Sequence, residues 1–360
     1  MRLNSSFKVT RRNLLRLSSG LFAGAVLKSY ELQNQSYALR MIDGSVTPPN
    51  LLFVRDHFNE PEISLDAWRL RIDGQVQRPY EIGFSDLVEM PSTKVEAFLE
   101  CAGNAANGSA VSNGSWEGVA LSSLLEAAAP LPDAVNVQLE GADSGRLYPD
   151  CPVLPYSQIV PIENCRDRAS LVAYKYNDLT LPSRNGFPAR AVFPGLYGMN
   201  SVKWLRRLTV LGANEQGTTF ERSGMNRLYN RVRGASGAKQ ITRVSSAQVK
   251  SVLAWPMDGL KLPAGRYSIW GFAWSGGGAI RKLSITTNGG KQWSPARLQA
   301  QASPHAWVQW RYEWNAVPGD YAVMSCAEDI RGTVQPLTRD PARKDGYELN
   351  WCAPVHCSVR

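Results

Sequence analysis

The sequence predicts an α+β domain followed by an all-β sandwich domain, behind a short N-terminal leader. Residues 39–244 mix strand-like alternation with short helical spacing, without the regular strand–helix rhythm of a doubly wound sheet. Residues 245–360 hold short alternating runs divided by Gly and Pro turns, which is typical of a β-sandwich. The 360 residues are enough for two domains of ordinary size.

Residues 1–38 have the order of an export signal. In TRRNLLRLSSGLFAGAVL, the adjacent Arg11 and Arg12 precede a modest apolar run. Ser36 and Ala38 supply the small residues expected before a cleavage site. Twin arginines before an apolar run resemble the Tat signal, with a Sec signal or an ordinary basic N-terminus as the alternative. We therefore expect a Tat-type signal peptide at 1–38 and a periplasmic protein.

The composition argues against nucleic acid as a partner and against a membrane span. Hydrophobic residues make up 44% and charged residues 20% of the chain, as in ordinary globular proteins. The net charge is +9, but the leader, with six basic residues and one acidic residue, carries +5 and leaves +4. That surplus is too small for a nucleic-acid surface. No segment after the leader is as long and apolar as a membrane-spanning helix.

The first domain is predicted to begin with two strands and a helix. AWRLRIDGQVQRPYEIGFSDLVEMP predicts a strand, a turn at Asp73-Gly74, a second strand and a short helix at 85–89. WEGVALSSLLEAAA predicts a second helix with Ser122 as its N-cap. Its apolar face would comprise Leu121, Leu124, Leu125 and Ala128. Further strands are predicted in AVNVQLEG, FPARAVFPGLYG and SVKWLRRLTVLG.

The second domain is expected to follow a linker. Residues 213–244, which are polar and rich in Gly, Asn and Arg, would form the linker that ends the first domain. The sandwich strands are predicted in VKSVLAWP, GRYSIWGFAWSG, AIRKLSITTNGGKQWSPARL and AWVQWRYEWNAVPGDYAVMSCAED.

Six cysteines are present, and their spacing matches no zinc or haem motif. An oxidising periplasm would permit disulfides. Cys151 could pair with Cys165, and Cys352 with Cys357, which would leave Cys101 and Cys326.

Cys101 lies where an apolar stretch, FLE, gives way to the loop CAGNAANG. Catalytic groups often lie at such strand ends, although cysteines there are also commonly core or disulfide residues. A nucleophilic cysteine needs a base, and only His57, His305 and His356 are available. No GxSxG, HExxH or P-loop motif occurs. The residues alone therefore leave the role of Cys101 open.

Six ordered blocks carry a resemblance to a known family. They are LLFVRDHF, FLECAGN, WEGVALSSLL, LEGADS, NGFPARAVFPGLYGMNSVKWLRRL and YSIWGFAWSGGGAIRKLSITTNGGKQW. In this order they resemble the sulfite oxidase family of molybdopterin enzymes. The resemblance implies a molybdenum–molybdopterin cofactor in an α+β domain, an immunoglobulin-like domain that dimerises, and hence a homodimer.

The resemblance also implies roles for individual residues. Cys101 would be the thiolate ligand of molybdenum, which suits a soft sulfur donor once deprotonated. Arg55 would be catalytic, near the substrate oxyanion. The alternative roles are a structural histidine for His57 and solvent-exposed surface charges for the charged residues among these positions. Positions that match cofactor-binding residues are His57, Asp143, Asn185 in place of a histidine, Arg190, Ser201 and Lys203, of which Arg190 and Lys203 would meet a phosphate.

Three departures from the family pattern affect the substrate pocket. Ala105 and Ala106 stand where sulfite-oxidising members usually carry two arginines. Gly224 matches the position of a substrate-site tyrosine, with Tyr229 only nearby. Asp345 matches a basic position before a Gly-Tyr pair, with Lys344 one place away. An anion with fewer cationic partners binds less tightly, so we expect low affinity for sulfite.

The sequence therefore predicts a periplasmic molybdopterin oxidoreductase that oxidises sulfite or a related small sulfur anion by two electrons. Water would supply the oxygen atom, and an external c-type cytochrome would accept the electrons. The alternatives are a sulfane dehydrogenase-like subunit and a non-enzymatic secreted β-sandwich binding protein. A sulfoxide reductase is disfavoured because that class generally lacks the C-terminal sandwich.

Overall fold

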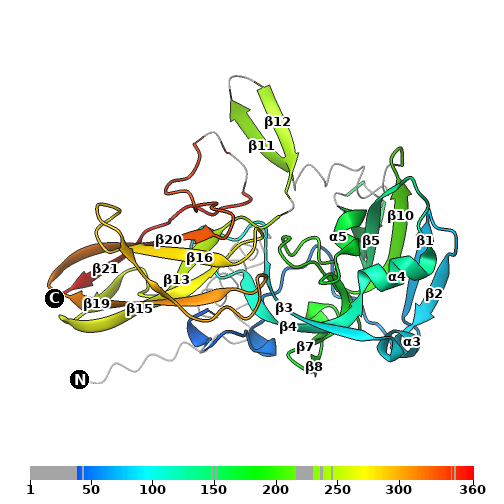
Figure 1. Ribbon diagram of the computed structural model, residues 1–360, viewed down its shortest axis with the longest axis horizontal. Helices are drawn as coiled ribbons and strands as arrows, with labels where there is room; N and C mark the ends of the chain where they lie inside the picture. The colour runs from blue at the N-terminus through cyan, green and yellow to red at the C-terminus, as the bar shows by residue number, and fades with distance from the viewer. Residues whose placement is uncertain are drawn as a thin grey trace, which may run out of the picture.

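The computed structural model describes residues 39–360, except 43, 147–148, 151, 216–229, 236–237, 245, 342 and 344–345. The predicted signal peptide and positions 151, 224, 229, 344 and 345 therefore lie outside the described residues. Figure 1 shows an α+β domain beside a β-sandwich, which confirms the predicted fold class. No helix in the described part is long and apolar enough to cross a membrane.

The first domain is built around a five-stranded sheet of order β2-β1-β10-β5-β6. Its strands are β1 (Arg69–Gly74), β2 (Tyr80–Gly83), β5 (Ala134–Gly145), β6 (Leu154–Pro161) and β10 (Leu205–Gly212). β1 and β10 run parallel, whereas the other pairs are antiparallel. The predicted strand–strand–helix order is confirmed by β1, β2 and α3 (Phe84–Glu89).

The predicted turn at Asp73-Gly74 is wrong, because both residues belong to β1. Arg207 Nη2 and Thr209 Oγ1 on β10 lie 2.8 Å and 3.2 Å from the Asp73 carboxylate. These contacts hold Asp73 against the neighbouring strand. The chain therefore turns later, between β1 and β2, at residues 75–79.

A second sheet carries the chain to Cys101. It comprises β3 (Ser92–Glu100), β4 (Val111–Ala120), β7 (Leu171–Tyr176) and β8 (Leu179–Thr180) in order, with β9 (Arg190–Val192) paired to β7. β3 and β4 pair along their length, from Ser92 opposite Val119 to Glu100 opposite Val111. The remaining short helices are α5 (Ile162–Arg166) and the 3-10 turns η1 (Leu39–Met41), η2 (Pro49–Leu51) and η3 (Ser183–Asn185).

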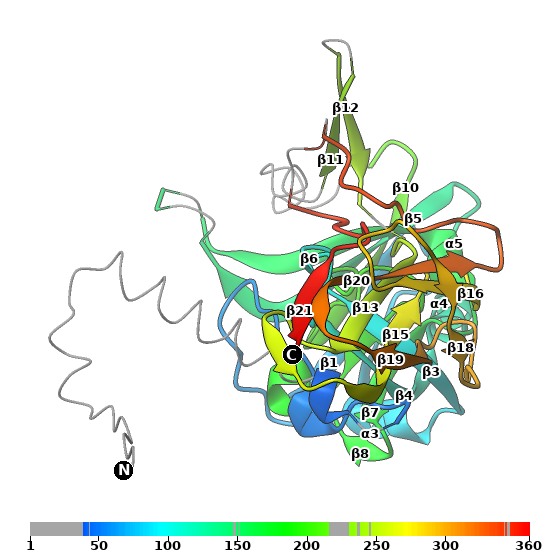
Figure 2. The same cartoon turned by 90° about the vertical axis from the view of Figure 1, so that its left-hand side faces the viewer.

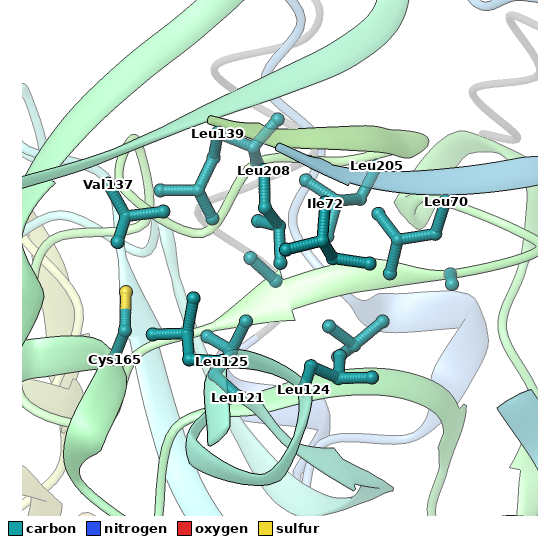
Figure 3. Packing of buried hydrophobic residues seen from close by; sticks show 14 of the residues in the cluster. Leu70, Ile72, Leu121, Leu124, Leu125, Val137, Leu139, Cys165, Leu205 and Leu208 are labelled. Carbon is teal, nitrogen blue, oxygen red and sulfur yellow. The ribbon is translucent and has the colours of Figure 1, made fainter. Parts of the chain in front are cut away.

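Helix α4 (Leu121–Ala128) lies against the first sheet and fills the core of the domain (Figure 3). Its predicted apolar face is confirmed, since Leu121, Leu124, Leu125 and Ala128 are all buried. The predicted Ser122 cap is wrong: the helix begins at Leu121 and has no side-chain cap. The carbonyl of Ser170 accepts the Leu121 N–H at 2.9 Å instead, so a neighbouring loop satisfies this end of the helix.

The predicted linker contains a hairpin of β11 (Asn230–Ala235) and β12 (Ala238–Arg243). Both views show it projecting away from the rest of the molecule (Figures 1 and 2). Within the described residues, these two strands pair only with each other.

The second domain is the predicted sandwich of two sheets. One sheet holds β13 (Lys250–Trp255), β15 (Gly265–Trp274), β19 (Val308–Ala316) and β18 (Arg297–Leu298). The other holds β14 (Leu260–Leu262), β21 (Val355–Val359), β20 (Gly319–Asp329), β16 (Ile280–Thr286) and β17 (Ser294–Pro295). Alternate residues such as Val323 and Ala327 on β20 face the shared apolar core.

Cys352 and Cys357, which the sequence left as one possible pair, are not bridged, because both thiols are free. Cys357 lies on β21 within the sandwich core, whereas Cys352 precedes the strand and contacts Cys326 instead. Cys165 is also a free thiol, buried in the core of the first domain (Figure 3).

A buried ion pair joins the two domains. Lys250 Nζ on β13 lies 2.9 Å from Glu100 Oε1 at the end of β3, and both side chains are 2% exposed. Trp274 Nε1 donates to the other carboxylate oxygen at 2.8 Å. The carbonyl of Asn104 also accepts from Lys250, at 3.1 Å. The residue before Cys101 is thus fixed to the second domain.

We predict that Lys250→Met destabilises the folded protein strongly, because it leaves the Glu100 carboxylate buried without a cation. Breaking such a pair costs about 3 kcal/mol or more, which thermal unfolding followed by circular dichroism would measure. Lys175→Met is the matched control: Lys175 and Glu117 are 2.8 Å apart, but Lys175 is 42% exposed. Exposed pairs contribute up to about 1 kcal/mol. Equal losses in the two variants would contradict the importance of the buried pair.

Candidate active site

A cavity of about 540 Å³ collects every site residue predicted from the sequence. Its walls come from residues 52–57, the end of β3, β5, and the segment from η3 to the start of β10. The C-terminal domain contributes Tyr347. The predicted residues that line it are Arg55, His57, Cys101, Asp143, Asn185, Arg190, Ser201 and Lys203.

Cys101 begins a tight turn directly after β3. Its N–H donates to Ala110 O and its carbonyl accepts from Asn104 N–H, both at 2.9 Å. Burial raises the pKa of the thiol, although the Gly103 N–H and the Arg55 charge act in the opposite direction. A thiol in this setting keeps its proton until a metal ion displaces it.

Arg190 is a buried cation in the cavity wall with no carboxylate bonded to it among the described residues. Its guanidinium donates to the carbonyls of Asn185 at 2.9 Å and Ser201 at 2.8 Å. It also lies over the Trp116 ring, 5.3 Å from the centroid. Burial lowers its pKa to about 10. A desolvated charge of this kind is stabilised by a bound anion, so this end of the cavity suits a phosphate.

Asp143 supplies a polar atom that needs a partner. Its Oδ1 is buried and forms no hydrogen bond within the described structure, and burial raises the pKa of the carboxyl to about 6. A Cβ at Gly141 would lie 2.5 Å from this oxygen, so a glycine there leaves room for the carboxyl. A ligand N–H directed at Oδ1 would remove the cost of the missing bond.

Lys203 closes the same side of the cavity. Its ammonium group donates to the Asp56 carboxylate and to the Arg184 carbonyl, and lies 4.1 Å from the centroid of the Trp204 ring. Burial lowers its pKa, while the hydrogen bond to Asp56 opposes this shift. The ammonium charge is thus largely balanced, unlike that of Arg190.

His57 lies between two aromatic rings at the cavity mouth, 5.1 Å from Phe58 and 5.5 Å from Tyr156 between centroids. Burial lowers the pKa of its imidazole, and the Arg55 charge lowers it further. The ring is therefore neutral at neutral pH and can both donate and accept a hydrogen bond.

Tyr347 is the site residue that the sequence reasoning missed. A Cβ placed on Gly103 would lie 4.0 Å from both Cys101 Sγ and Tyr347 Cε1, so the phenol ring and the thiol flank Gly103 in the cavity wall. Tyr347 belongs to residues 346–352, which we call the strap. A substrate-site tyrosine was expected after the VKW block; the signal that would have located this one was the Gly346-Tyr347 pair.

The strap is fixed to the loop that carries Cys101. Glu348 N–H donates to Ala102 O at 2.9 Å. The buried Glu348 carboxylate in turn accepts from Arg343 Nη1 at 2.9 Å. Arg343 also donates to the Tyr347 carbonyl at 2.8 Å. These bonds hold Tyr347 in place, and the ion pair to Glu348 neutralises the Arg343 charge.

Ala105 and Ala106, where arginines were expected, do not line the cavity. Ala106 is buried, 4% exposed, and the same loop is tied to the sandwich by Leu253 N–H, which donates to Asn107 Oδ1 at 2.8 Å. Among the described lining residues, Arg55 is thus the one arginine whose charge acts on the Cys101 thiol.

Comparison with known proteins identifies both domains. Residues 57–219 match the oxidoreductase molybdopterin binding domain, and residues 241–342 match the Mo-co oxidoreductase dimerisation domain. Sulfite oxidase from Gallus gallus is 30% identical over 81% of this chain and 68% of its own length. Mitochondrial sulfite oxidase from Mus musculus is 29% identical over 84% of this chain and 59% of its own.

A solved structure has the same fold. The sulfane dehydrogenase SoxCD from Paracoccus pantotrophus superposes with a TM-score of 0.78 and 28% identity, over 89% of this chain and 82% of that one.

The cavity fits the cofactor of this family. One cavity holds a thiol for the metal, a carboxyl oxygen without a hydrogen-bond partner for a pterin N–H, and a buried guanidinium for a phosphate. Cys101 would bind the metal, Asp143 the pterin, and Arg190 the phosphate. The chain belongs to the sulfite oxidase family of molybdopterin-dependent oxidoreductases, and molybdenum–molybdopterin is its cofactor.

Proposed function

We propose that this protein oxidises sulfite or a related sulfur oxyanion and passes the electrons to an external c-type cytochrome. For sulfite, one ion and one water give sulfate, two protons and two electrons, so water is the oxygen source. The bound cofactor supplies the two-electron redox chemistry. The observation that carries the proposal is the placement of Arg55, Cys101 and Tyr347 in the cavity that also holds the cofactor-binding set.

The chain's own residues would bind and orient the anion. The Arg55 guanidinium supplies positive charge near Cys101 and can bind two oxygens of a sulfur oxyanion. The Tyr347 hydroxyl is suited to donate a further hydrogen bond. Neutral His57 adds a donor or acceptor without adding charge. The single unbalanced cation beside the thiol supports modest affinity for a doubly charged anion.

A second candidate, oxidation of a sulfane sulfur, has support from the structural similarity to a sulfane dehydrogenase. A substrate with one charged end would need only one arginine. The same cavity argues against a non-enzymatic binding protein, because it buries an uncompensated cation and an orphan carboxyl beside a thiol.

The cellular context of the proposed activity is also a proposal. The Tat-like pattern in residues 1–38 supports a periplasmic location, and the match to a dimerisation domain supports a homodimer.

A substrate screen tests the proposal. Cofactor-loaded protein would be assayed with sulfite, thiosulfate and a sulfoxide, with oxidised cytochrome c as acceptor for the first two. We expect oxidation of a sulfur anion with a high KM for sulfite, and a further rise of about tenfold in KM for Arg55→Gln. Arg184→Gln, an exposed arginine outside the cavity, is the control. Tight sulfite binding that Arg55→Gln leaves unchanged would contradict this account of the pocket.

We predict that Cys101→Ser abolishes turnover and lowers molybdenum content while the chain stays folded. A hydroxyl is a poor ligand for a soft metal, and the serine fits the same turn. Metal analysis, cytochrome reduction and circular dichroism would measure these outcomes. Cys165→Ala, which removes a buried thiol that does not line the cavity, should keep its molybdenum. Full activity in Cys101→Ser would refute the ligand assignment.

Tyr347→Phe removes only a hydroxyl from a residue that lines the cavity with Cys101. We expect kcat/KM to fall about tenfold, the effect of losing one hydrogen bond to a charged substrate, with molybdenum content unchanged. Tyr321→Phe is the control, because that hydroxyl donates to Val317 O within the sandwich. Unchanged kcat/KM in Tyr347→Phe would remove this tyrosine from the substrate site.

A further inference from the structure

Two cysteines outside the cavity meet where the strap crosses the sandwich. Cys326 lies on β20, whose inward residues Val323 and Ala327 belong to the core, so the Cys326 side chain faces the opposite side of the sheet. Cys352 ends the strap and is 2% exposed. It belongs to none of the apolar clusters of the described structure.

The backbone brings the two residues together. Gln335 N–H donates to Ala327 O at 2.9 Å, and Cys352 N–H donates to Pro336 O at 2.8 Å. The Cys326 thiol donates to Gln335 O at 3.4 Å. Gln335 is thus hydrogen-bonded to Cys326, and the next residue, Pro336, is hydrogen-bonded to Cys352. The two cysteines therefore lie close together.

The two thiols also share a hydrogen bond, and this bond shifts their pKa values in opposite directions. Accepting this bond from Cys352 lowers the pKa of Cys326, against the effect of burial. The same bond and burial raise the pKa of Cys352. By contrast, burial is the leading effect at Cys165 and Cys357, and it raises the pKa of both. A partly exposed thiol in contact with a buried thiol is the arrangement used in thiol–disulfide exchange.

We propose that Cys326 and Cys352 are an oxidisable pair that closes into an intrachain disulfide. The oxidant is another disulfide, such as oxidised glutathione or an oxidised dithiol protein. The Cys326 thiolate attacks one oxidant sulfur and releases the first thiol. Cys352 then loses its proton, attacks the Cys326 sulfur and releases the second thiol. Two thiols of this chain are oxidised to one disulfide while one oxidant disulfide is reduced to two thiols.

The bridge ties β20 to the strap that carries Tyr347. It closes a loop from Cys326 to Cys352, within which Glu348 N–H bonds to Ala102 O beside Cys101. A covalent closure restricts the unfolded chain, and it anchors the strap close to the cavity. The pairing depends on the contact between the two thiols and not on the proposed substrate.

The test uses the full-length, cofactor-loaded protein treated with oxidised glutathione. Acid quenching, alkylation of free thiols in denaturant and peptide mapping by mass spectrometry would follow. We expect one linked pair of peptides that contain Cys326 and Cys352, with Cys165 and Cys357 alkylated. The oxidised protein should melt about 5 °C above the reduced protein.

Single substitutions provide the controls. Cys326→Ser and Cys352→Ser should each remove the linked peptides and the redox-dependent shift in melting temperature, whereas Cys357→Ser should keep both. If either serine variant fails to fold, the peptide map of the unsubstituted protein still shows whether Cys326 and Cys352 are linked. Alkylation of both cysteines after oxidation, glutathione left on Cys326, or a bridge to a different cysteine would each overturn the pairing.

Discussion

The buried pair of Glu100 and Lys250 is the contact on which the site depends. Glu100 is the last residue of β3 and precedes Cys101, while Lys250 is the first residue of β13. The Glu100 carbonyl also accepts from Gly198 N–H at 2.7 Å, next to the segment that carries Ser201 and Lys203. A buried ion pair adds little net stability. Its contribution here is positional, because it ties the residue before Cys101, and with it one wall of the cavity, to the second domain.

The two parts of the cavity differ in how far their charged and polar groups are balanced. At one end, Arg190 and Asp143 are buried without full partners, and that cost is recovered when a ligand of complementary charge and hydrogen bonding enters. Near Cys101, Arg55 is more open to the cavity and Lys250 is already balanced by Glu100. The end with Arg190 and Asp143 is therefore demanding in chemistry, whereas the region near Cys101 holds little excess charge.

Local pattern was enough to predict the sandwich and the face of α4, whereas the eight predicted residues that line the cavity came from the resemblance to a known family. What the sequence did not predict depends on contacts between distant segments. Arg207 holds Asp73 in β1 across the sheet, and Ser170 replaces Ser122 at the start of α4. Tyr347 was missed because its neighbour Cys101 lies more than half the chain away, and no periodicity relates such positions. Ala105 and Ala106 told us that two positive charges are absent from the chain. They did not locate the cavity, because Ala106 is buried and neither residue lines it.

The strap links a residue of the cavity wall, Tyr347, to the second domain. Glu348 has a left-handed backbone, with φ of 51°, which is unfavourable for a side chain of this kind. It is held there by its N–H bond to Ala102 and its ion pair with Arg343. Tyr347 is thus held in the cavity wall by contacts to the Cys101 loop and to Arg343. The second domain, which matches a dimerisation domain, therefore also supplies a residue to the wall of the cavity.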